Sequence, residues 1–181
     1  MWFIVNRHLR VAVCFTAILS GGCGFRPLYK AGGGSDPTAL ASVEIAKIQD
    51  REGQHLRNLL MAGLSPRGPA ARADYRLKVT LTENKTELAI RKDETATRAN
   101  LTIYARFELV ALRDPSLGAF RGNALSTNSY NILTSDFATL SAENDARKRA
   151  LRTLAEEIRL RIAAAIGNPQ AFSKGAAGNA S

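Results

Sequence analysis

Alternation of apolar and polar residues predicts a run of β-strands through the middle of the chain. Residues 74–83 alternate strictly, and residues 100–112 repeat the same pattern. The segment 86–99 between them is polar and threonine-rich, without glycine or proline, and is predicted to form the far end of a long hairpin. A more polar fourth strand is predicted over 119–131, and a short alternation at 42–49 predicts the first strand.

Apolar residues at three- and four-residue spacing predict two helices. The first begins at Asp50, a candidate N-cap, and runs to about Leu64, where residues 65–69 (SPRGP) end it. The second runs from about residue 137 to 166, with Ser135 or Asp136 as its cap and Gly-Asn-Pro after it. Its predicted buried stripe consists of Leu140, Leu151, Leu154, Ile158, Ile162 and Ile166.

The resulting element order, β-α-β-β-β-α, predicts an α/β fold. The apolar face of such a sheet must be buried against other elements, and two amphipathic helices can cover it on that side. We therefore expect a two-layer sandwich, with a four-stranded mixed sheet covered on one face by two helices. Residues 42–167 would form this domain, and the small, polar residues 168–181 would form a disordered tail.

The first 22 residues have the layout of a secretory signal peptide. Arg7 and Arg10 are basic, residues 11–19 are all apolar except Thr16, and Ser20-Gly21-Gly22 supplies the small residues of a cleavage site. A nine-residue helix would be about 14 Å long, half of the roughly 30 Å hydrocarbon core of a bilayer. The segment is therefore predicted to be removed on export rather than to span a membrane.

The cleavage site resembles a bacterial lipobox, in which a cysteine receives a diacylglycerol and becomes the first mature residue. Cys23 takes this role, although Ser20 stands where a lipobox usually has leucine and Leu19 lies one position earlier. Two acyl signals on Cys23 would give stable membrane anchoring. Residues 23–41, which include the glycine-rich stretch 30–40, are predicted to be the lipidated N-terminus and a flexible tether.

The positive charge of the chain allows two interpretations, a solvated surface and a contact with an anionic partner. Removing residues 1–22 takes away two arginines and no acid, leaving 23 basic and 16 acidic residues and a net charge of +7. Arg147, Lys148, Arg149 and Arg152 form a run without an acid, which is typical of a solvated helix face or of an anion contact. Export removes nucleic acid as a partner, so anionic lipids and acidic protein surfaces are left.

Residue types needed for catalysis are scarce. After removal of residues 1–22, His55 is the single histidine and Cys23 the single cysteine. The chain has no H-x-x-x-H, G-x-S-x-G, G-x-G-x-x-G or P-loop string. We therefore expect no enzyme activity, cofactor or metal site, and we interpret His55 as an ordinary polar residue of the first helix.

Two sequence segments resemble a known family. The string Cys23-Gly24-Phe25-Arg26-Pro27-Leu28-Tyr29, directly after a signal peptide, is similar to the start of the mature LptE lipoproteins of lipopolysaccharide assembly. Residues 123–147, with NSYN at 128 and SDFAT at 135 before a long arginine-rich helix, resemble the alphaproteobacterial branch of that family.

The resemblance implies an outer-membrane lipoprotein on the periplasmic side, and Gly24 in place of aspartate favours sorting to that membrane. It implies a protein that plugs and helps assemble the LptD β-barrel translocon, assisting lipopolysaccharide insertion into the outer leaflet. Arg91, Lys92 and Arg98, at the predicted hairpin end, are candidate lipopolysaccharide contacts. A stand-alone periplasmic lipid- or solute-binding lipoprotein, or a transporter's auxiliary subunit, is the alternative.

Overall fold

A four-stranded mixed sheet forms one layer of the domain. The computed structural model describes residues 37–90 and 96–174. Strand β1 pairs in parallel with β2, while β2, β3 and β4 follow one another as antiparallel neighbours, in the order β1-β2-β3-β4. The predicted mixed sheet is therefore confirmed. The strands are β1 (Val43–Ile45), β2 (Tyr75–Ile90), β3 (Ala96–Ala111) and β4 (Ala119–Asn131).

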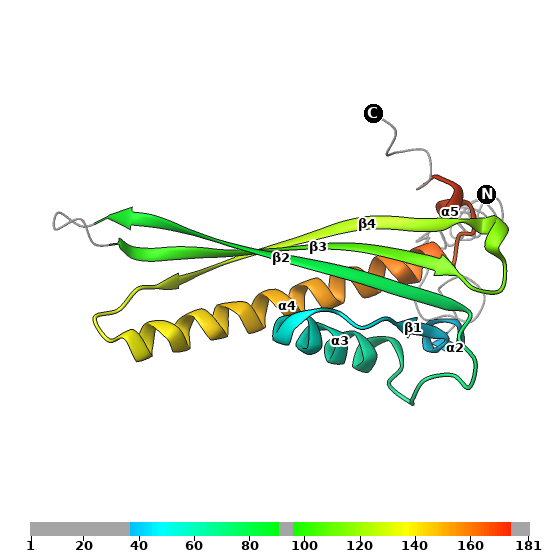
Figure 1. Ribbon diagram of the computed structural model, residues 1–181, viewed down its shortest axis with the longest axis horizontal. Coiled ribbons are helices and arrows are strands. Elements are labelled where there is room, and N and C mark those ends of the chain that lie inside the picture. Colours follow the sequence, from blue (N-terminus) through cyan, green and yellow to red (C-terminus); the bar gives the residue numbers. More distant parts are fainter. Residues whose placement is uncertain (1–36, 91–95, 175–181) are drawn as a thin grey trace, which may run out of the picture.

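Two helices form the second layer, and both lie on the same side of the sheet (Figure 1). They are α3 (Asp50–Leu64) and α4 (Asp136–Ile166), and their presence on one face confirms the predicted two-layer sandwich. Ser135 caps α4 as expected, because its hydroxyl accepts a hydrogen bond from the Ala138 amide at 3.4 Å. Shorter helical segments are α2 (Pro37–Ala41), η2 (Pro115–Leu117) and α5 (Gln170–Lys174).

The core lies between the sheet and the two helices. Every second residue of β2 and β3 points to the helices, as the alternation predicts, and the apolar ones among them at the α3 end are buried or partly buried. The largest fully buried side chains of the sheet and of helices α3 and α4 are Leu56, Leu60, Leu64, Leu77, Leu101, Ile103, Leu109, Leu151, Leu154, Ile158 and Ile162.

Strands β2 and β3 form a ribbon that extends well beyond β1. Their pairing runs from Tyr75 opposite Ala111 to Ile90 opposite Ala96, with irregularities between Glu87 and Ile90. The prediction that residues 86–99 belong to the far end of a hairpin is confirmed within the described residues. Its threonines favour extended backbone, and the absence of glycine and proline leaves the ladder unbroken until near its end.

Helix α4 runs far past the beginning of α3, and this changes the predicted stripe. It has 31 residues against 15 in α3, and α3 starts level with Arg147, whose Nε lies 3.8 Å from Glu52. Leu140 faces the same way as Leu151 but has no α3 beside it, so it is 54% exposed. Its assignment to the buried stripe is wrong.

The ends of several elements also differ from expectation. Asp50 does not cap α3: Gln49 holds the N-cap position without a side-chain cap bond, and Asp50 follows in the left-handed region at φ 64°. Strand β1 is confined to Val43–Ile45, because the chain leaves the sheet there to reach α3. Residues Pro37–Ala41, assigned to the tether, are helical instead.

The predicted disordered tail is wrong for residues Gln170–Lys174, which form α5. Phe172 is only 1% exposed, and its ring lies 6.0 Å from that of Tyr75 and 6.3 Å from that of Phe120, centroid to centroid. One aromatic side chain among small residues therefore attaches this segment to the sheet. Residues 175–181 lie outside the described residues.

Candidate functional site

Most of the sequence-predicted site residues lie outside the described residues. These are the lipidation residue Cys23 and the following Gly24, Phe25, Arg26, Pro27, Leu28 and Tyr29, together with Arg91 and Lys92. Arg98 is described: it is exposed on β3, opposite Asn131 of β4 and close to the far end of the ribbon. The lipid anchor and the lipopolysaccharide contacts stay predictions.

An ionic cluster joins the sheet to both helices around Arg147. The guanidinium donates two hydrogen bonds to the carboxylate of Glu83 on β2, both at 2.8 Å, and one to Glu143 at 2.6 Å. Arg147 is 15% exposed, so it is not part of a solvated basic face as the run of charges suggested. The hydrogen bonds that Arg147 donates to Glu83 contribute most to raising the pKa of Arg147, and burial opposes them.

Glu143 continues the cluster toward the ribbon. Its carboxylate accepts a hydrogen bond from Lys85 Nζ at 2.5 Å and one from the Tyr130 hydroxyl at 3.2 Å. Burial alone would raise the pKa of Glu143, but hydrogen bonds from Lys85 and Arg147 hold it below its usual value. Burial, followed by the Glu143 charge, raises the pKa of Tyr130. The contacts of Glu143 join strands β2 and β4 to helix α4.

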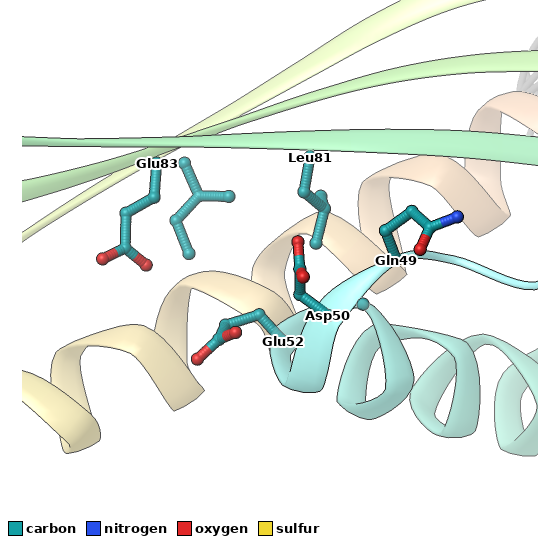
Figure 2. A pocket seen from close by; sticks show the side chains of 7 residues that line it. Gln49, Asp50, Glu52, Leu81 and Glu83 are labelled. Carbon is teal, nitrogen blue, oxygen red and sulfur yellow. The ribbon is translucent and has the colours of Figure 1, made fainter.

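A shallow pocket opens beside this cluster, between β2 and the start of α3. Figure 2 shows Leu81 and Glu83 pointing from the strand toward Asp50 and Glu52. Glu83 is bound to Arg147 and Glu52 lies 3.8 Å from the same guanidinium, so both carboxylates already have a cation beside them. Across residues 37–90 and 96–174, no group of three or more His, Cys, Asp or Glu side chains is placed to hold a metal ion.

His55 lies on the exposed side of α3. It lines a second surface hollow with Arg51, Glu52, Asn144 and Arg147. A histidine in this position has no serine, cysteine or threonine nucleophile among the residues that line the hollow. His55 is an exposed polar residue on the surface of α3, in agreement with the interpretation from the sequence.

Within residues 37–90 and 96–174 no helix lies on the opposite face of the sheet, and we call it the uncovered face (Figure 1). Its side chains are mostly polar, but Tyr104 and Leu125 stand directly opposite one another and are 48% and 51% exposed. The uncovered face consists of the even-numbered residues 76–86 of β2, the even-numbered residues 98–110 of β3 and the odd-numbered residues 119–131 of β4.

A second exposed apolar group lies where β4 turns into α4. Leu133, Phe137 and Leu140 are 48%, 82% and 54% exposed. The Thr139 hydroxyl shapes this turn, since it accepts from the Leu133 amide at 2.9 Å and donates to the Leu133 carbonyl at 3.1 Å. Sequence reasoning missed this group because its spacing matches that of the buried stripe.

Comparison with solved structures identifies similar folds. A Caulobacter crescentus CB15 protein described as a lipoprotein matches with a TM-score of 0.56 and 23% identity, covering 73% of this chain and 96% of its own. A minor lipoprotein from Acinetobacter baumannii matches with a TM-score of 0.52 and 17% identity, covering 67% and 91%. At these identities the likeness shows a shared fold. None of the curated proteins matches the chain.

No helix in the described part of the chain has the length and apolar character needed to cross a bilayer. The model of the LptE family, described as lipopolysaccharide-assembly, matches residues 40–162. That range extends from α2 to the last turns of α4 and includes the whole sheet. The two-layer sandwich and the family match agree, and the chain belongs to the LptE family of lipopolysaccharide-assembly proteins.

Proposed function

We propose that this protein is an outer-membrane lipoprotein that plugs the LptD β-barrel, helps it assemble, and so assists lipopolysaccharide insertion into the outer leaflet. The observation that carries the proposal is the family match over residues 40–162, which covers the sandwich almost completely. The exposed surface of the sheet layer is consistent with it, because barrel lumens are polar and the uncovered face is rich in Thr, Asn and Arg.

The length of the domain supports the same function. Helix α4, with 31 residues, is about 46 Å long at 1.5 Å per residue. A bilayer with its headgroup regions is about 40–45 Å thick. A narrow domain of this length can therefore extend through a barrel from the periplasmic side to the level of the outer leaflet.

The ends of the long axis also suit this placement. Helix α2, where the described chain begins, lies near α5 at one end, while the β4–α4 turn lies at the other (Figure 1). A tether that leads from α2 to a lipid on Cys23 would hold the first end near the periplasmic leaflet. The far end of the ribbon, which carries Arg98, would then lie toward the outer leaflet.

Two measurements test the proposal. Full-length protein extracted in detergent is expected to copurify with the LptD barrel, and its intact mass should correspond to a chain that begins at Cys23 with added acyl groups. A free thiol on residue 23 would refute the lipid anchor. Absence of the barrel, together with tight salt-independent binding of a lipid, would favour the stand-alone lipid-binding lipoprotein.

A further inference from the structure

We propose that the uncovered face is the surface on which this protein docks against its protein partner, and that the matching patch of the partner carries carboxylates. The inference rests on the proposed function, in which that partner is the barrel and the patch belongs to its inner wall. It specifies which side of the sandwich makes the contact, and it names the side chains that make it.

The first argument is an excess of positive charge that the face does not neutralise. Glu108 binds Arg121 at 2.6 Å, so the nearest carboxylate to Lys78 across the ladder is already engaged. Within the described residues, neither Lys78 nor Arg106 forms an ion pair, and both are exposed. Two further carboxylates at this end of the sheet are also paired: Glu44 of β1 is bound to Arg76 at 3.0 Å, and Asp74, just before β2, is bound to Arg113.

The two unpaired cations are close together. Lys78 lies opposite Glu108, and Arg106 lies opposite Thr80, so Lys78 and Arg106 are diagonal neighbours across β2 and β3. Diagonal neighbours in an antiparallel pair are about 7–8 Å apart. Two like charges at this spacing repel one another, and a partner carboxylate placed between them would relieve that repulsion.

The second argument is the apolar pair beside these cations. Tyr104 and Leu125 occupy the row next to Arg106 and are about half exposed, although they belong to a face that is otherwise polar. Tyrosine and arginine are enriched at the energetically dominant centres of protein interfaces, where burial excludes water. The row therefore provides an apolar centre with positive charge at its edge.

The third argument favours a protein over a lipid surface. Beyond the apolar pair, the face carries neutral hydroxyl and amide groups, which bond to one another as Thr102–Thr127 at 3.0 Å and Ser129–Asn100 at 2.6 Å. Their remaining donors and acceptors match polar side chains of a partner, whereas phosphate headgroups recognise cations. Opposite the uncovered face we therefore expect a partner surface with carboxylates near Lys78 and Arg106. Apolar groups should lie opposite Tyr104 and Leu125, and neutral polar groups beyond them.

The test is a double charge reversal with a matched control. Lys78→Glu/Arg106→Glu reverses two exposed cations of the uncovered face, and Arg149→Glu/Arg152→Glu reverses two exposed cations of α4 on the other layer. In detergent extracts of full-length lipidated protein, the first variant should reduce the copurified barrel by about tenfold or more, because like charges would then face each other. The control should retain barrel within about twofold of wild type.

The possible outcomes separate a failure of the docking assignment from a failure of the proposed function. If wild type retains the barrel and the two reversals behave alike, or the α4 variant alone loses it, the docking assignment is wrong while the proposed function stands. If wild type retains no barrel, the proposed function fails first. Binding of wild type to phosphatidylglycerol vesicles that is lost only in the sheet variant, with barrel retention intact, would identify the face as a lipid surface and overturn the proposal.

Folding is checked separately from binding. Both variants alter exposed side chains, so their circular dichroism spectra and melting temperatures should match those of wild type. If the reversal destabilises the sheet, Lys78→Gln/Arg106→Gln removes the charges without adding carboxylates and should still lower barrel retention. Tyr104→Ser/Leu125→Ser should lower retention too, and full retention by both of these variants would refute the proposal.

Discussion

At the residue scale, Arg147 of α4 contacts carboxylates from three elements, Glu83 of β2, Glu52 of α3 and Glu143 of its own helix. Its planar guanidinium binds the Glu83 carboxylate through two nitrogens and still reaches Glu143, so β2 and α4 are joined by one group. A lysine has the charge but lacks the fork that allows both contacts in fixed directions. The position therefore depends on shape as well as on charge.

Replacing Arg147 by alanine is expected to destabilise the protein by roughly 2 kcal/mol, because two partly buried carboxylates lose their hydrogen-bonded cation. The loss stays below that of a fully buried pair, since Glu83 is still 27% exposed. Urea denaturation of the protein without residues 1–23 measures this loss. Arg152→Ala, on the exposed side of the same helix, is the control and should cost no more than about 0.5 kcal/mol. Equal losses in the two variants would contradict the assignment.

The cluster also predicts how stability depends on acid. The pKa of Glu143 is lower in the folded protein than its ordinary value of 4.5, so the unfolded chain takes up the proton first as pH falls. The stabilisation is present above about pH 4.5 and is lost as the pH falls below that value through the folded pKa. Denaturation midpoints measured across this acidic range should fall less steeply in Glu143→Gln than in wild type. Asp145→Asn, at an exposed site on the same helix, serves as the control, and Glu143→Gln should depart from wild type more than this variant does.

At the element scale, the sequence predicts what depends on local periodicity. Leu77 and Val79 alternate with Arg76 and Lys78, and this pattern alone identifies the buried side of β2. The sequence predicts strand β4 and helix α3 at the residues where they occur, because turn residues and prolines mark their ends.

Features that depend on distant partners could not be predicted in this way. The sequence alone reveals that Glu143 and Arg147 are four residues apart and can pair on one helix. The other partner of Arg147, Glu83, lies 64 residues away on another element. Leu140 has the spacing of a core residue, and its exposure follows from where α3 begins. The burial of Phe172 follows from no periodic pattern, since its helix has only five residues.

The buried stripe of α4 yields a comparison within one helix. Leu154→Ala should cost about 2–5 kcal/mol, because Leu154 is completely buried between sheet and helices. Ile158→Ala should do the same for the same reason. Leu140→Ala removes the same atoms as Leu154→Ala from a half-exposed site and should cost less than about 1 kcal/mol. Chemical denaturation compares the three, and similar losses at 140 and 154 would refute the packing of α4.

At the scale of the whole molecule, charge and contact area have separate roles. A net charge of +7 without residues 1–22 attracts anions over several ångströms. In the proposed function a plug would contact its barrel over a broad surface, so no single exposed cation would dominate the contact. Contact with lipopolysaccharide phosphates would depend on a few exposed charges, and salt screens such charges beyond about 8 Å at physiological ionic strength.

Single replacements of Arg91, Lys92 or Arg98 by alanine are therefore expected to weaken barrel binding by no more than about threefold. Lipopolysaccharide binding to the same purified protein should fall much more steeply than barrel binding as salt is added. Titrations of both ligands across one salt series provide the measurement. Lipopolysaccharide binding that does not change with salt would show that apolar contacts carry it.

The overhanging ribbon of β2 and β3 has a consequence for how such proteins diverge. The ribbon pairs with β4 as far as Arg98 opposite Asn131 and continues past that pair, so its end can lengthen or shorten without disturbing Leu56 or Leu60 in the core. Because side chains alternate between faces, an odd change in one strand would exchange the two faces of everything beyond it. Insertions and deletions in related chains should therefore come in even numbers and in both strands at once, which makes ribbon length a trait that evolution adjusts in steps of about 7 Å.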